Sequence, residues 1–255
     1  MKRILIAGLI GGTVFGILLT FAAAKHVVSQ HKEKLTAQNE KLETENGELK
    51  SKVGKEMAIG DGAKTLSGDS AGWALALVNE SHPLDTDYEP ELTEIDTERS
   101  VDTRIAEDLE QMLKDAQEEG LSMYVASAYR SYDQQRQVFN STMQDWIAQG
   151  YTPLDAYDET KKSVAVPGTS EHATGLALDI IASYYEELDE EQGDTPEQKW
   201  LAEHCWEYGF ILRYPPDKAD VTGIIYEPWH YRYVGKEAAK EITEQGLTLE
   251  EYLEQ

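Results

Sequence analysis

Two short segments, about fifty residues apart, contain the side chains best suited to metal chemistry in this chain. The first contributes His172 and Asp179, and the second contributes Glu227 and His230. Two imidazoles and one carboxylate are a common ligand set of catalytic zinc, which keeps a fourth position open for water. A further carboxylate nearby can take a proton from that water. The residue types are therefore suited to a catalytic zinc site in which a carboxylate beside the ligands could act as the base.

The local sequence provides elements that could bring these side chains together. Residues 176–181 are apolar except for Asp179, which predicts a buried strand, and Gly175 would let the chain bend just before it. Residues 229–234 predict a second strand, and Pro228 would keep the preceding glutamate outside its regular hydrogen bonding. An ionised aspartate inside a buried strand is costly unless it is paired or binds a metal.

The spacing alone leaves a structural role open for each of these residues. A lone histidine is more often a packed or surface residue than a ligand. A buried aspartate can be satisfied by an arginine or by backbone amides. The pattern is also not a local zinc signature such as His-Glu-x-x-His.

Several separated motifs give a more specific indication. Ser-x-His-x-x-Gly-x-Ala-x-Asp begins at Ser170, and Glu-x-Trp-His begins at Glu227. Further motifs are Ser-Ala-Tyr-Arg-Ser at 127–131 with Gln135, Pro-Gly-Thr-Ser-Glu-His at 167–172 and Gly-Phe-Ile-Leu-Arg-Tyr-Pro at 209–215. In this order they resemble the VanY-like D-alanyl-D-alanine carboxypeptidases, zinc peptidases that trim bacterial peptidoglycan stem peptides. The resemblance extends from about Trp73 to about Gly246.

The resemblance implies a role for each motif residue. The implied metal is Zn²⁺, and its ligands are His172, Asp179 and His230. Glu227 would be the base, and Arg130 would stabilise the oxyanion and hold the substrate. The remaining motif residues with an implied substrate-binding or supporting role are Gln135, Ser170 and Trp229. Arg130 could instead be a structural ion-pair partner, Ser170 could satisfy a turn, and Trp229 could belong to the core.

The implied reaction is removal of the terminal D-Ala from a peptidoglycan stem peptide by a D,D-carboxypeptidase. Two alternatives stay open. An L,D-carboxypeptidase acting on tetrapeptide stems would use the same motifs. A non-catalytic, membrane-tethered protein that binds the cell wall would keep the metal for structure, although it would need neither Glu227 nor Arg130.

The chain is predicted to have four segments: a transmembrane signal-anchor at 1–25, a helical stalk at 26–53, a flexible linker at 54–72 and a zinc carboxypeptidase domain at 73–255. Lys2 and Arg3 precede an apolar run at 4–24 that is long enough to span a bilayer. The positive residues favour a single-pass protein of the cell membrane whose catalytic domain is extracellular. Ala22-Ala23-Ala24 leaves a cleaved signal peptide as the alternative.

The fold class expected for the domain is α+β, with a mainly antiparallel central sheet and flanking helices. Periodic apolar residues predict a helix near 105–120. Thr195-Pro196-Glu197-Gln198 resembles a capping box with proline at the first helical position, and it predicts a second helix that ends at Gly209. The formal net charge of −25 argues against a nucleic-acid partner. Cys205 is the single cysteine, so no intrachain disulfide can form, and it is expected to pack in the core. The oligomeric state stays open.

Overall fold

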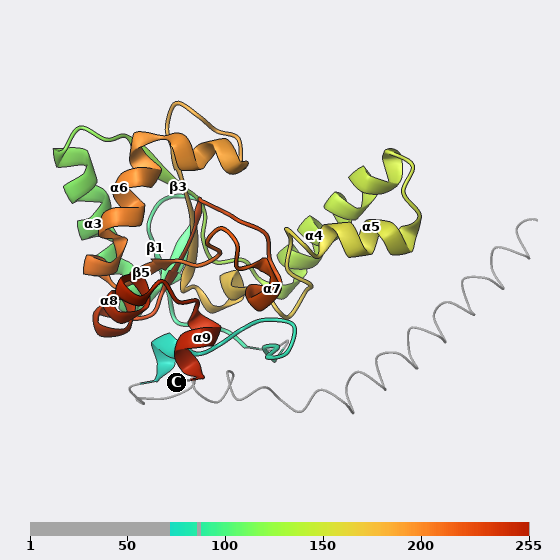
Figure 1. Cartoon of the computed structure of the whole chain (residues 1–255), viewed down its shortest axis with the longest axis horizontal. Helices are drawn as coiled ribbons and strands as arrows, with labels where there is room; N and C mark the ends of the chain where they lie inside the picture. Colours follow the sequence, from blue (N-terminus) through green and yellow to red (C-terminus); the bar gives the residue numbers. More distant parts are fainter. Residues whose placement is uncertain (1–71, 86–87, 255) are drawn as a thin grey trace, which may run out of the picture. The chain divides into compact units, whose positions relative to one another are not determined.

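The computed structural model describes residues 72–85 and 88–254 (Figure 1). The predicted anchor and stalk lie outside these residues, as does all of the predicted linker except Gly72. Within the described part of the chain, no helix is both long and apolar enough to cross a membrane. The boundaries of the four predicted segments therefore stay predictions.

An antiparallel sheet lies at the centre of the fold. Its strands, in spatial order, are β3 (Met123–Ser127), β4 (Ala177–Ala182), β6 (His230–Tyr233) and β5 (Phe210–Leu212). Every neighbouring pair in this sheet is antiparallel. A separate hairpin pairs β1 (Leu92–Glu94) with β2 (Ser100–Asp102). The mixed helix and antiparallel-sheet fold confirms the α+β prediction.

Helices surround this sheet, and they form two groups in Figure 1. The first group contains α3 (Ala106–Glu118), α6 (Pro196–His204) and α8 (Lys236–Gln245). In the second group, α4 (Tyr132–Ala148) and α5 (Pro153–Thr160) lie side by side. The shorter α-helices are α7 (Ala219–Thr222) and α9 (Leu249–Leu253). The 3₁₀-helices are η1 (Trp73–Leu75), η2 (Thr103–Ile105), η3 (Glu171–Thr174), η4 (Glu190–Asp194) and η5 (Cys205–Tyr208).

The two faces of the sheet have different chemistry. Leu178 lies opposite Tyr231 across the β4–β6 pair, and both belong to the main apolar core with residues of α3 and α6. Successive side chains of a strand point to opposite faces. The next pair in the register, Asp179 opposite His230, therefore lies on the other face of the sheet. The core and the predicted metal ligands thus occupy opposite sides of the same two strands.

The helix predicted near 195–209 differs from its prediction in two respects. The Thr195 hydroxyl accepts the backbone N–H of Gln198, as expected for an N-cap. The Gln198 side chain does not complete the expected capping box, because its amide donates to the Ile180 carbonyl and accepts from the Tyr231 hydroxyl. The α-helix also ends at His204, and η5 continues the chain as far as Gly209.

Gly175 makes the bend that was predicted before β4. Its φ of +73° is in the left-handed region that favours glycine, and its carbonyl accepts the backbone N–H of Asp102 at 3.0 Å. A Cβ atom at this position would lie 2.7 Å from the same backbone nitrogen. The close approach of β2 therefore requires glycine where η3 passes into β4.

We predict that Gly175→Ala destabilises the domain much more than Gly223→Ala does. Gly223 has a similar φ of +78°, but a Cβ there would meet no atom within 4 Å. The control should cost about 1 kcal/mol for its backbone conformation alone. Gly175→Ala should cost roughly 3 kcal/mol or more, since backbone atoms must also move. Urea unfolding of both variants measures the difference, and equal losses would contradict the proposed steric role of Gly175.

Candidate active site

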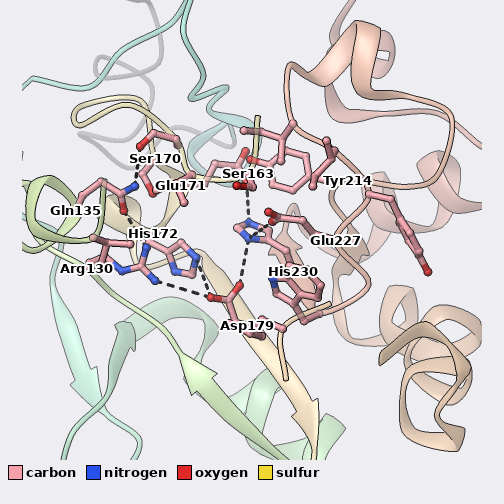
Figure 2. Close-up of a pocket in the computed structure, with 18 of the residues that line it drawn as sticks. Arg130, Gln135, Ser163, Ser170, Glu171, His172, Asp179, Tyr214, Glu227 and His230 are labelled. Atoms are coloured by element: carbon pink, nitrogen blue, oxygen red, sulfur yellow. Dashed lines mark hydrogen bonds and ion pairs between the residues drawn. The ribbon is translucent and has the colours of Figure 1, made fainter. Parts of the chain in front are cut away.

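The three predicted metal ligands meet on the polar face of the sheet (Figure 2). His172 comes from η3, Asp179 from β4 and His230 from β6. His172 Nε2 lies 3.4 Å from Asp179 Oδ2, and His230 Nδ1 lies 3.3 Å from Asp179 Oδ1. All three side chains are buried, and one ligand atom from each lies within 4.8 Å of the others. The local sequence motifs thus converge as predicted.

Backbone contacts hold His172 in this orientation. Its Nδ1 lies 2.7 Å from the Ala128 carbonyl oxygen, so the ring presents Nε2 to Asp179. The Arg130 backbone N–H donates to the His172 carbonyl at 3.1 Å, which ties η3 to the end of β3. An outer hydrogen bond of this kind orients the ring of a metal-binding histidine.

The donor set fits a zinc ion. Two imidazole nitrogens and one carboxylate are ligands that zinc accepts, and the adjoining cavity leaves room for a further ligand. Asp179 Oδ1 is buried and has no hydrogen-bond partner among the described residues. Burial alone would raise the pKa of Asp179, but His172 and His230 hold it well below its usual range. The aspartate is therefore an anion: Arg130 Nη2 lies 3.9 Å from its Oδ2, and its Oδ1 is left for a further cation.

Glu227 lies beside the triad, just before β6, where the sequence predicted it. Its Oε2 is 3.6 Å from His230 Nδ1, and its carbonyl accepts the His230 backbone N–H at 3.2 Å. Burial, together with the nearby charge of Asp179, raises the pKa of Glu227 to about 8, although His230 and Arg130 act in the opposite direction. A carboxyl group with a raised pKa beside a candidate metal site has the position and chemistry of a general base.

Arg130 is held rigidly at the wall of the cavity. Its Nη1 donates to Gln135 Oε1 at 2.9 Å, and its Nη2 donates to Ser127 Oγ at 2.7 Å. Gln135 in turn donates from Nε2 to the Ala165 carbonyl at 2.7 Å. Both ends of the Gln135 amide are thus occupied, which places this residue behind Arg130 as a support. The α4 capping box begins at Ser131, so the helix start fixes the same corner.

A cavity of about 430 Å³ adjoins the triad. Arg130 is the one lysine or arginine among the described residues that line it. Ser170 and Trp229, both predicted site residues, also line the cavity and are buried. Its wall further includes Val138, Val164, Leu188, Asp189, Glu190, Tyr214, Ile225 and Tyr226. All eight residues predicted for the site therefore lie at one cavity.

Sequence reasoning missed a buried charge cluster behind the triad, formed by Glu171, Arg213, Arg232 and Glu250. Glu171 Oε1 accepts from Arg213 Nε and from Arg232 Nη1, each at 2.8 Å. Arg213 also donates to both oxygens of Glu250, at 2.7 and 2.8 Å. Burial alone would raise the pKa of Glu171, but the two guanidinium groups hold it well below its usual range. The sequence did contain a signal for this cluster, because its two arginines occur within segments whose other residues are mostly apolar.

Two neighbouring residues that could suggest further chemistry lie away from this site. His204 is partly exposed, and its Nδ1 lies 2.9 Å from Glu207 Oε1. Cys205 is buried in the main core, where burial raises the pKa of its thiol to about 12. An inert core thiol agrees with the predicted packing role.

Comparisons with known proteins place this fold and site in a family. The family model for VanY, D-alanyl-D-alanine carboxypeptidase, matches residues 98–236. A D-alanyl-D-alanine carboxypeptidase of Enterococcus faecalis is 43% identical over 186 residues, which cover 73% of this chain and 68% of that protein. The chain therefore belongs to the VanY D-alanyl-D-alanine carboxypeptidase family.

Two solved structures add to this assignment. One is a glutamate-to-alanine mutant of the D,D-pentapeptidase VanY from the VanB-type vancomycin resistance cassette, in complex with Zn(II). Its TM-score is 0.65 at 42% identity, covering 71% of this chain and 99% of that one. The other is the LD-carboxypeptidase LdcB, with a TM-score of 0.62 at 40% identity, covering 71% of this chain and 87% of that one. The chain is thus similar both to a D,D-peptidase and to an LD-carboxypeptidase.

Proposed function

We propose that this chain is a zinc-dependent D,D-carboxypeptidase that removes the terminal D-Ala from peptidoglycan stem peptides. The observation that supports this most strongly is the convergence of the His172, Asp179 and His230 triad with Glu227 and Arg130 at one cavity. A relative of the same family is named a D-alanyl-D-alanine carboxypeptidase, and the similar VanY mutant was solved with Zn(II).

The proposed reaction assigns proton transfer to Glu227. When bound by the triad, zinc supplies an acidified water and polarises the scissile carbonyl. Glu227 accepts a proton from the attacking water and passes it to the leaving amine of D-Ala. Burial chiefly raises the pKa of Glu227 to about 8, and a divalent cation held by the triad would lower that pKa, which favours the ionised base.

In this mechanism Arg130 binds the substrate or stabilises the oxyanion. Its guanidinium is fixed by Ser127 and Gln135, and it is 20% exposed at the cavity. A guanidinium fork suits either the terminal carboxylate of the peptide or the oxyanion that forms during attack. Because Gln135 and Ser127 hold it in place beforehand, little rearrangement is needed when the substrate arrives.

The two alternative functions differ in how they use this cavity. A wall-binding protein that kept zinc only for structure would need neither the buried Glu227 nor the positioned Arg130, and the family assignment adds to the case for catalysis. An L,D-carboxypeptidase would use the same triad, base and arginine, and LdcB is 40% identical to this chain. Substrate choice separates these two peptidase activities.

We predict that Glu227→Gln abolishes turnover while zinc stays bound. The amide keeps the size of the side chain but cannot accept the proton, so kcat should fall by about a hundredfold or more. Glu190→Gln is the matched control, because Glu190 lines the same cavity without contacting the triad. Rates of D-Ala release and zinc content per chain are measured for both. Full activity of Glu227→Gln would show that another group is the base.

We also predict that pentapeptide stems are cleaved in preference to tetrapeptide stems. Residues 73–255 are incubated with muramyl tetrapeptide and pentapeptide, with and without a chelator, and free D-Ala is followed by mass spectrometry. Chelator-sensitive release from the pentapeptide is the expected result. Release from the tetrapeptide alone would favour the L,D activity, and release from neither by a zinc-loaded protein would favour the wall-binding function.

We further propose that residues 1–25 anchor the protein in the cell membrane, with residues 73–255 facing the cell wall. The support is the apolar run at 4–24 after Lys2 and Arg3. The full chain should sediment with membranes and resist extraction by alkaline carbonate, whereas a chain that starts at residue 26 should not. Recovery of a shortened chain from the culture medium would favour the cleaved signal peptide instead.

A further inference from the structure

The two histidines of the triad present different nitrogens to it. His172 directs Nε2 inward, because its Nδ1 contacts the Ala128 carbonyl. His230 directs Nδ1 inward, toward Asp179 and Glu227, so its Nε2 points away from the cavity. That outer nitrogen lies 3.7 Å from Glu171 Oε2. A dashed line joins the two side chains in Figure 2.

The atoms on both sides of this 3.7 Å gap have no other partner. His230 Nε2 and Glu171 Oε2 are both buried and lack a hydrogen bond to any described residue. Leaving a buried donor or acceptor unpaired costs free energy, so each such atom in a folded protein needs an explanation. A shift of roughly 0.5 Å would bring the two atoms within hydrogen-bond distance of each other.

Arginines fix Glu171 through its other oxygen only. Oε1 accepts from Arg213 and Arg232, and Oε2 stays directed at His230. Arg232 is itself fixed, because its Nη2 donates to the carbonyls of Ala74 and Ala76. If Glu171 were merely a counterion for the two arginines, nothing would require its second oxygen to face an imidazole nitrogen.

We propose that Glu171 is a positioning residue for His230. Its Oε2 accepts a hydrogen bond from the protonated Nε2 of His230, so that Nδ1 carries no proton and is free to bind the metal. This inference rests on the proposed zinc site. The carboxylate fixes both the tautomer and the orientation of the ring, and it makes Nδ1 a stronger ligand. His172 has a neutral carbonyl in the corresponding position, so the two histidines receive different support.

The test measures zinc affinity in two matched variants, Glu171→Gln and Glu250→Gln. Each removes one carboxylate from the same buried cluster, and each leaves Arg213 with one remaining carboxylate. Of these two glutamates, only Glu171 faces His230. Competition with a fluorescent zinc chelator gives the Kd of the unmodified protein and of both variants. We expect Glu171→Gln to weaken zinc binding by about 10- to 100-fold and Glu250→Gln to weaken it by less than about threefold.

If Glu171→Gln binds zinc as tightly as the unmodified protein does, the proposal is overturned. Equal losses of zinc affinity in both variants would also overturn it, since the effect would then belong to the cluster as a whole. Thermal unfolding of the metal-free variants shows how much each change costs the fold itself. Zinc affinity is measured without substrate, which separates this inference from the proposed activity. If the unmodified protein binds zinc through the triad but releases no D-Ala, the proposed activity is contradicted and the proposed role of Glu171 still stands.

A second measurement needs no variant at position 171. Histidine ¹⁵N NMR of the zinc-loaded, unmodified protein identifies the protonated nitrogen of each ring, and His172→Gln and His230→Gln spectra assign the signals. The expected result is a slowly exchanging proton on Nε2 of His230 and on Nδ1 of His172. Zinc bound to Nε2 of His230 would overturn the proposal even if Glu171→Gln failed to fold.

Discussion

The site depends on the register between β4 and β6. Because these antiparallel strands place Asp179 directly opposite His230, the two side chains lie on the same face, close enough to share one cation. The neighbouring pair, Leu178 and Tyr231, lies on the opposite face and belongs to the apolar core. A slip of one residue would exchange these faces, burying the ligands in the core. The same packing that stabilises the sheet therefore also sets the geometry of the triad.

Burial of charge is the second constraint on this fold. The His230 ring lies within 3.7 Å of carboxylate oxygens from Glu171, Asp179 and Glu227. Burial by itself would lower the pKa of His230, but the three nearby carboxylates raise it to about 9. So many anions in one buried region require compensating positive charge. Two arginines provide it on the Glu171 side, and a divalent cation would provide it on the cavity side.

Most of the site could be predicted from the sequence because its residues lie in short motifs whose local structure is regular. The strand at 176–181 and the bend at Gly175 follow from apolar runs and backbone freedom. The cluster of Glu171 with Arg213 and Arg232 could not be predicted, because its contacts join residues 42 and 61 positions apart. The small β1–β2 hairpin was also missed, since such short strands depend on tertiary packing more than on local pattern. The helix α5 was missed although Thr152 caps it and Pro153 occupies its first turn, which are local signals in the sequence.

The two sides of the cavity have different structural origins, and this bears on specificity. Asp179 and His230 are held by strands of the central sheet, and Glu227 lies just before one of them, whereas Arg130 is held by the end of β3 and the start of α4. In the proposed reaction all of these groups act on the scissile peptide bond or on the carboxylate of the terminal D-Ala, and both kinds of substrate have these features. The proposed reaction thus leaves substrate discrimination to the rest of the wall, where Val138, Leu188 and Ile225 are 37%, 50% and 40% exposed. This apolar wall comes from α4 and from loops outside the sheet, so its side chains can change without moving the strands that hold Asp179 and His230.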